Sequence, residues 1–171
     1  ITFHLYNNIM NTTRGIRNNN PLNIRHSPSR WQGMAVEQTD PSFVQFRSMA
    51  YGYRAACKLL QSYWQRFRKE GKPFTVRTII SRWAPPEDNN DTESYIRSVL
   101  LIGGLGGQET LFPPDNPLGY ERLERLLIAM TCVESGIGTN RVDSKMILEG
   151  YRMAFPHVRE VSECNKLADF G

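Results

Sequence analysis

Acidic residues are scarce in the first half of this chain, and none precedes Glu37. Residues 1–83 contain thirteen Lys and Arg against three acids, whereas residues 84–171 contain eight against fourteen. Such an asymmetry indicates either an anionic partner for the first half or contact between the two halves. Nucleic acid and an anionic cell wall both fit the first option.

Long apolar runs, cysteines and histidines are also few. No stretch approaches the roughly 20 apolar residues that span a bilayer, and no basic segment followed by an apolar run marks a secretory signal peptide. Cys57 and Cys132 lie in apolar helical patterns, which predicts buried free thiols, and Cys164 leaves their number odd. The three histidines share no ligand spacing with one another or with the cysteines. We therefore expect neither a metal site nor a cofactor.

The length of 171 residues and the hydrophobic content of 40% suit one globular domain. Residues 1–13 differ from the rest, so we expect a flexible N-terminal extension followed by a single monomeric domain over 14–171. Apolar residues three and four apart predict a mainly α fold with some β structure (α+β), comprising five helices and one small hairpin. The expected helices cover 48–71, 75–84, 89–104, 120–136 and 143–155, the hairpin pairs 31–36 with 43–46, and 103–118 forms the longest loop.

The stretch "RGIRNNNPLNIR" at 14–25 places four asparagines around Pro21. Asparagine hydrogen-bonds nearby backbone and tolerates left-handed geometry, so the stretch is expected to be a loop. Its amides serve either to hold that loop or to read the hydroxyl and N-acetyl groups of a sugar. An exposed aromatic platform beside the loop would suit a glycan groove. The candidate substrate-binding residues are Asn18, Asn19, Asn20, Asn23 and Trp31.

Glu134 ends the strongest predicted helix, between Val133 and Ser135. The negative pole of the helix dipole and apolar neighbours both raise the pKa of a carboxyl group there. A glycosidase needs such a protonated acid to donate to a leaving oxygen. The alternative is an ordinary solvated glutamate at a helix end.

Several motifs together resemble a family of phage and prophage proteins related to lysozyme-like cell-wall hydrolases, over residues 14–102. "NNNPLNIR…WQG…FVQF" is similar to the loop and hairpin that follow the catalytic helix in bacterial N-acetylglucosaminidases. "SRWAPP" lies where lytic transglycosylases carry a Tyr-Asn-Ala-Gly turn. "TESYIRSVL" resembles their Glu-Thr-x-x-Tyr-Val helix, which places Tyr95 on the family's active-site tyrosine.

The chain departs from that family pattern in one respect. In those families a helix ending in Glu-Ser-Gly precedes the hairpin, whereas no acid precedes Trp31 here. "CVESGIGTN" at 132–140 resembles the missing helix end. A circular permutation would reconcile the two, because the termini of compact domains often lie close together.

A second carboxylate would decide the reaction type. Asp40 or Glu37 on the expected hairpin could position a water or stabilise an oxocarbenium ion, and a separation of about 6.5–9.5 Å from Glu134 would favour inverting hydrolysis. If neither approaches, a lone acid resembles the lytic transglycosylases, in which the sugar's own hydroxyl closes an anhydro ring. Glu87 and Asp88 form the rival acidic pair.

We therefore expect a glycosidase or lytic transglycosylase, of endolysin type, that cleaves peptidoglycan glycan strands. Glu134 would be the general acid and base, with Tyr95 and Asp40 in the active site. The protein would be made in the bacterial cytoplasm without a standard signal peptide and act at the cell wall or in a phage particle. One alternative is a non-catalytic virion or wall-binding protein. Another is a nucleic-acid binder, although no recognised binding motif is present.

Overall fold

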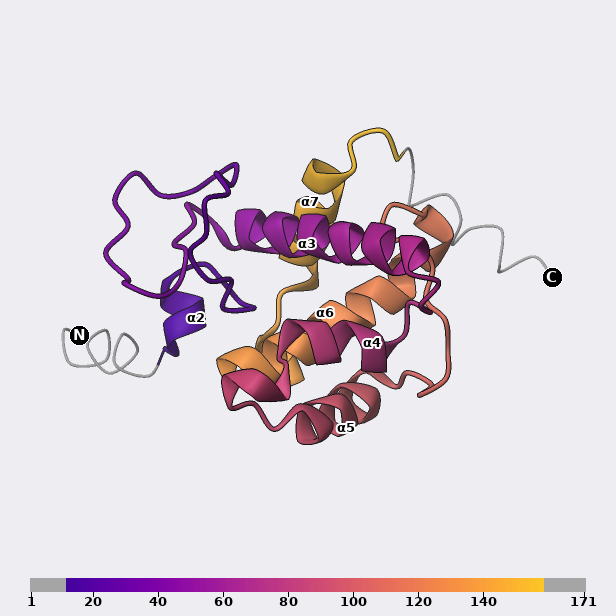
Figure 1. The fold of residues 1–171 in the computed structure, drawn as a ribbon. Helices are drawn as coiled ribbons and strands as arrows, with labels where there is room; N and C mark the ends of the chain where they lie inside the picture. Colours follow the sequence, from indigo (N-terminus) through magenta and orange to yellow (C-terminus); the bar gives the residue numbers. More distant parts are fainter. Residues whose placement is uncertain (1–11, 159–171) are drawn as a thin grey trace.

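The computed structural model describes residues 12–158. The expected extension falls mostly, and Cys164 wholly, outside the described residues. Within them the fold is mainly α, as the sequence predicts, and Figure 1 shows the helices around one centre. The main helices are α3 (Met49–Lys69), α4 (Val76–Trp83), α5 (Thr92–Gly103), α6 (Tyr120–Ser135) and α7 (Ser144–Ala154). The shorter elements are α2 (Arg14–Arg17) and the 3-10 turns η1 (Pro86–Asp88), η2 (Pro117–Gly119) and η3 (Thr139–Arg141).

Side-chain caps fix where these helices begin. Thr75 accepts a hydrogen bond from the Thr78 backbone N–H at the start of α4. At the start of α5 the Asp91 side chain accepts from the Ser94 backbone N–H. At the start of α7 the Asp143 side chain accepts from the Lys145 backbone N–H. Each cap satisfies one of the N–H groups that a helix leaves without an internal partner. Gly136, with φ 61°, ends α6 in left-handed geometry that glycine adopts without strain.

The core lies between the helices. α3 packs against α7, α5 packs against α6, and α4 packs against α5. Gly150 allows α3 and α7 to approach closely. A Cβ at this position would lie 2.6 Å from the Ala50 carbonyl oxygen, so only glycine fits there. α6 supplies Leu126, Leu127 and Met130, which are wholly buried. The burial of these side chains agrees with the apolar spacing that predicts this helix.

The expected hairpin over 31–36 and 43–46 is not formed as two strands. Among the described residues there are two isolated bridges, Arg25 with Phe43 and Met34 with Phe46. The Asp40 carboxylate accepts the backbone N–H groups of Ser42 and Phe43, so side chains take bonds that a strand ladder would use. The irregular segment 18–48 is consequently longer than the loop after α5.

Three further expectations from the sequence can be compared with the structure. Arg14–Arg17 is a helical turn, whereas the whole stretch 14–25 was expected to be loop. Cys57 and Cys132 are free and buried, as predicted, and burial raises the pKa of the Cys57 thiol to about 12. The ends of the described segment lie on opposite sides of the molecule in Figure 1, so the proximity assumed for a circular permutation is not seen between them.

None of the helices between residues 12 and 158 combines the length and the apolar character needed to cross a membrane.

Candidate functional site

The site forms where the end of α6 meets the asparagine loop, residues 18–23. Ser135 Oγ donates to the Pro21 carbonyl at 2.8 Å, and the Asn23 amide donates to the Glu134 carbonyl at 2.9 Å. The last carbonyls of a helix lack partners within it, so the loop completes the end of α6. Segments 111 positions apart are thereby held at a fixed distance.

The loop needs asparagines for its backbone as well as for its amides. Asn19 and Asn23 adopt left-handed geometry with φ of 50° and 52°, which asparagine tolerates better than most residues. Gly15 lies beneath them, where a Cβ would come within 2.7 Å of Ser135 Oγ. Small size at Gly15 therefore lets the loop reach α6.

Three donors converge on the Glu134 carboxylate. The Tyr95 hydroxyl donates to Oε1 at 3.0 Å, and the Trp83 indole N–H donates to the same oxygen at 3.1 Å. The Asn23 amide donates to Oε2 at 3.2 Å. The donors come from α5, the end of α4 and the asparagine loop, so four parts of the fold meet at one carboxyl group.

Burial dominates the electrostatics of this group. Desolvation raises the pKa of Glu134 above its usual range, although the Tyr95, Asn23 and Trp83 hydrogen bonds and the nearby Arg25 charge act in the opposite direction. Burial and the Glu134 carboxylate both raise the pKa of Tyr95, so its hydroxyl stays protonated and acts as a donor. The protonated form of Glu134 is thus favoured relative to a solvated glutamate.

Glu134 is half-buried and lines an open pocket of about 350 Å³. The asparagine loop and the segment after it form one wall, α3 and the end of α4 form another, and the turn after α4 adds Asp88 and Asn90. Both polar and aromatic side chains line it, a combination that suits a sugar. The lining side chains include Asn23, Arg25, His26, Trp31, Tyr63, Trp83, Asp88 and Asn90.

The structure brings together some of the residues predicted from the sequence. Asn23, Trp31 and Glu134 line the pocket. Tyr95 contacts Glu134 but is only 8% exposed and is not among the lining residues. Its place is behind the carboxylate, where it positions Glu134.

The other asparagines do not fit the substrate-binding expectation. Asn18, Asn19 and Asn20 do not line the pocket, and Asn18 and Asn20 are buried. Asn18 donates to the Asp40 carboxylate, while Asn19 and Asn20 donate to backbone carbonyls at 2.8–3.1 Å. These amides hold the loop together, which was the alternative that the sequence left open.

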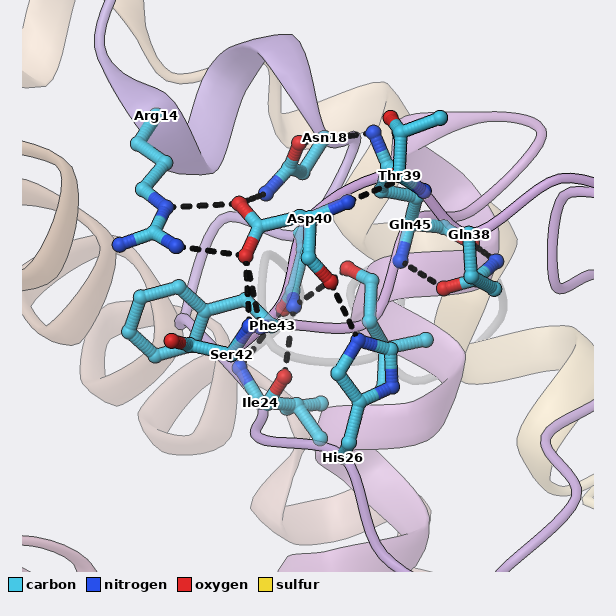
Figure 2. Close-up of polar contacts among 12 residues, drawn as sticks. Arg14, Asn18, Ile24, His26, Gln38, Thr39, Asp40, Ser42, Phe43 and Gln45 are labelled. Carbon is cyan, nitrogen blue, oxygen red and sulfur yellow. Dashed lines mark hydrogen bonds and ion pairs between the residues drawn. The ribbon is translucent and has the colours of Figure 1, made fainter.

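Asp40, expected in the active site, is instead the centre of a structural network (Figure 2). Its carboxylate, 9% exposed, accepts two hydrogen bonds from Arg14 at 2.6 Å and one from Asn18 at 2.8 Å. The Arg14 guanidinium, with the Asn18 amide and two backbone N–H groups, holds the pKa of Asp40 well below its usual range. Neither Asp40 nor Glu37 lines the pocket, so neither faces Glu134 across it.

The sequence interpretation missed the role of one pocket residue and named another only as a rival candidate. Trp83 was not among the candidate site residues, yet its indole N–H donates to Glu134 Oε1. Its position in "SRWAPP", the motif that resembles the transglycosylase turn, was the available signal. Asp88, from the rival acidic pair, lines the pocket, whereas Glu87 does not.

Between residues 12 and 158, no group of three or more His, Cys, Asp and Glu side chains is placed to hold a metal ion.

Comparison with known proteins identifies a relative that is similar to most of the chain. Protein P5 of Pseudoalteromonas phage PM2 is 33% identical to the chain over 150 residues, covering 86% of the chain and 85% of P5. The chain belongs to the P5 family. No protein-family profile matches it. The name of the P5 relative describes no activity, so the chemistry of the family is argued from the site.

Proposed function

We propose that this member of the P5 family is a lysozyme-like enzyme that cleaves the glycan strands of peptidoglycan, with Glu134 as its general acid and base. The observation that carries the proposal is the half-buried Glu134 carboxyl group, which has a raised pKa, three fixed donors and one side open to a polar, aromatic pocket. A carboxyl group kept protonated in this way can donate a proton to a glycosidic oxygen.

The two carboxyl oxygens have different surroundings. Oε1 accepts from both Tyr95 and Trp83, whereas within the described residues Oε2 accepts only from Asn23. We therefore assign the transferable proton to Oε2. The donors on Oε1 fix the orientation of the carboxyl group and stabilise the carboxylate left after proton transfer.

The proposed reaction has two proton transfers. Glu134 protonates the glycosidic oxygen as the bond to the anomeric carbon breaks, which leaves an oxocarbenium-like centre and a Glu134 carboxylate. An O–H nucleophile then attacks the anomeric carbon and gives its proton to that carboxylate. The nucleophile is water in a hydrolase and a hydroxyl of the same sugar in a lytic transglycosylase.

The remaining pocket residues suit a sugar strand. Trp31 offers an apolar ring for a sugar face, while Asn23 and Asn90 offer amides for hydroxyl or N-acetyl groups. Asp88 stands on the rim with no hydrogen-bonding or ionic partner for its side chain between residues 12 and 158. It is the carboxylate available to direct a water if hydrolysis is the outcome.

Mass analysis of digested, purified peptidoglycan tests the proposal directly. We expect new ends at glycosidic bonds, with fragments carrying an added water after hydrolysis and fragments lacking it after transglycosylation. Fragments cut within the peptide stems would contradict a glycan-cleaving function.

A second candidate function rests on the phage relative. A virion or wall-binding protein of the P5 family could use the same pocket to hold a glycan without cutting it. Glycan binding in the absence of any cleavage products would favour this candidate.

A further inference from the structure

A basic face lies on α3, α4 and the link between them, which Figure 1 shows running directly from one helix to the other. Residues 64–83 contain six Lys and Arg and a single acid, Glu70. All six cations are exposed, and four of them line one open depression of about 580 Å³. Arg66, Lys72, Arg77 and Arg82 line this depression, whereas Arg68 and Lys69 line a second one with Trp64 and Gln65. The basic face is the cation-rich surface that these six cations form around the end of α3 and along α4.

The helix dipole does not explain this concentration of charge. Arg66, Arg68 and Lys69 lie in the last turn of α3, where cations are favourable. Arg77, in contrast, lies in the first turn of α4, where a cation is unfavourable, and Lys72 lies outside both helices. The charges therefore surround the end of α3 and continue along α4, on more than one side of α3.

Neighbouring acids neutralise the face only in part. Glu70 is shared by Arg66 at 2.7 Å and Lys72 at 2.8 Å, and Arg77 pairs with Glu93 at 2.6 Å. These pairs are exposed and therefore weak, so a competing anion can displace them. Arg68, Lys69 and Arg82 have no carboxylate within 4.0 Å in the part of the chain that the structure describes.

We propose that the basic face binds a linear polymer of phosphate groups that carries no bases, as a phosphate-rich polymer of a cell envelope would. Guanidinium groups match phosphate oxygens in bidentate geometry, and cations spread over two depressions suit the repeated charges of a long polymer better than a single small anion. The face lies beside the Glu134 pocket, since Tyr63 lines that pocket and is covered by Arg82. Binding here does not depend on the proposed cleavage.

The aromatic residues of this surface argue against nucleic acid. The Arg68 guanidinium lies over the Trp64 ring at 5.5 Å, and the Arg82 guanidinium lies over the Tyr63 ring at 5.0 Å. Both rings are thereby covered on one face by a cation and packed on the core on another. Single-stranded nucleic acids bind through open rings on which bases stack, and these rings are not open.

The experiment measures binding of inorganic polyphosphate, with single-stranded DNA of equal phosphate number as the comparison. The test variant is Arg68→Gln/Lys69→Gln/Arg82→Gln, which removes the three cations that lack a carboxylate partner. The matched control is Arg141→Gln/Lys145→Gln/Arg152→Gln, which removes the same residue types from exposed positions at and near α7. Both variants lower the net charge by the same amount, and melting curves establish that each is folded.

We expect the test variant to bind polyphosphate about tenfold or more weakly at low salt, with the slope of log K against log salt reduced by about 2. The control should bind like wild type, and polyphosphate should bind at least as tightly as DNA. Equal losses in test and control would show that net charge alone matters and overturn the proposal. Absence of polyphosphate binding, or clearly tighter DNA binding, would overturn it as well. Because binding is read without cleavage, inactivity on peptidoglycan would leave this result unaffected.

Discussion

Tyr95 and Glu134 lie 39 positions apart and are joined by a 3.0 Å hydrogen bond from the Tyr95 hydroxyl to Glu134 Oε1. The tyrosine is only 8% exposed, so the bond reaches the carboxyl group from the protein side. The pocket side of Glu134 is left open for a ligand. This pair is the point at which the helix at 92–103 and the helix at 120–135 combine into a site.

Tyr95→Phe should move the pH dependence of glycan cleavage to higher pH. The Tyr95 hydroxyl bond lowers the pKa of Glu134 against the larger effect of burial, so removing it raises that pKa further. The fall in rate that accompanies deprotonation of Glu134 then occurs at higher pH. The maximal rate also decreases, because Oε1 loses a donor that positions the carboxyl group. A pH–rate profile on purified peptidoglycan measures both effects.

Tyr53→Phe is the matched control for that variant. The Tyr53 hydroxyl makes a buried 3.0 Å hydrogen bond with Thr131, away from the pocket. Losing either buried hydroxyl bond should lower the free energy of unfolding by about 1 kcal/mol. An identical shift of the pH profile in both variants would show that Tyr95 acts through stability and not through Glu134.

The pH dependence of stability should carry a signature of Glu134. Its folded-state pKa is raised above the unfolded value of about 4.3. Glu134 therefore stabilises the folded protein most below that pH, and this stabilisation is lost as pH rises through the folded-state pKa. Chemical denaturation of wild type and Glu134→Gln across pH 4–8 should show the mutant gaining relative stability as pH rises. A difference independent of pH would contradict the raised pKa.

Asp40 should change the pH dependence of stability in the opposite direction. Its folded pKa is lowered, so its contribution is present above the unfolded value of about 3.9 and is lost as pH falls toward the folded pKa. Asp40→Asn should lower the free energy of unfolding near pH 7 and make it less sensitive to acid. Asp88→Asn, at an exposed position, is the control for loss of one negative charge. Equal behaviour of the two variants would remove the structural role assigned to the Asp40 network.

The sequence was sufficient to predict the five main helices because their signals are local. Apolar spacing, the caps at Thr75 and Asp143 and the stop at Gly136 each act within a few residues, and the structure contains all of them. The hairpin prediction failed because side chains compete for the backbone. The Asp40 carboxylate binds two backbone N–H groups that an alternating strand pattern assigns to a partner strand.

The site was predictable only in part, since its contacts are long-range. The position of Glu134 at a helix end indicated a raised pKa, and burial is indeed its main cause. The sequence alone cannot show which asparagines of the loop face a ligand. Asn20 is wholly buried and bonds backbone, whereas Asn23, three positions later, reaches Glu134 and the pocket.

The central claim concerns proton donation by Glu134, and Glu134→Gln tests it most directly. Glutamine keeps an oxygen that can accept from Tyr95 and Trp83 but has no proton to give a glycosidic oxygen. The matched control is Glu149→Gln, an exposed change on the helix at 144–154. The measurement is turbidity clearing of purified peptidoglycan, with melting curves to show that each variant is folded. We expect wild type and Glu149→Gln to clear alike, and Glu134→Gln to be slower by about 10² to 10⁴. A folded Glu134→Gln protein that clears at the wild-type rate would contradict the account.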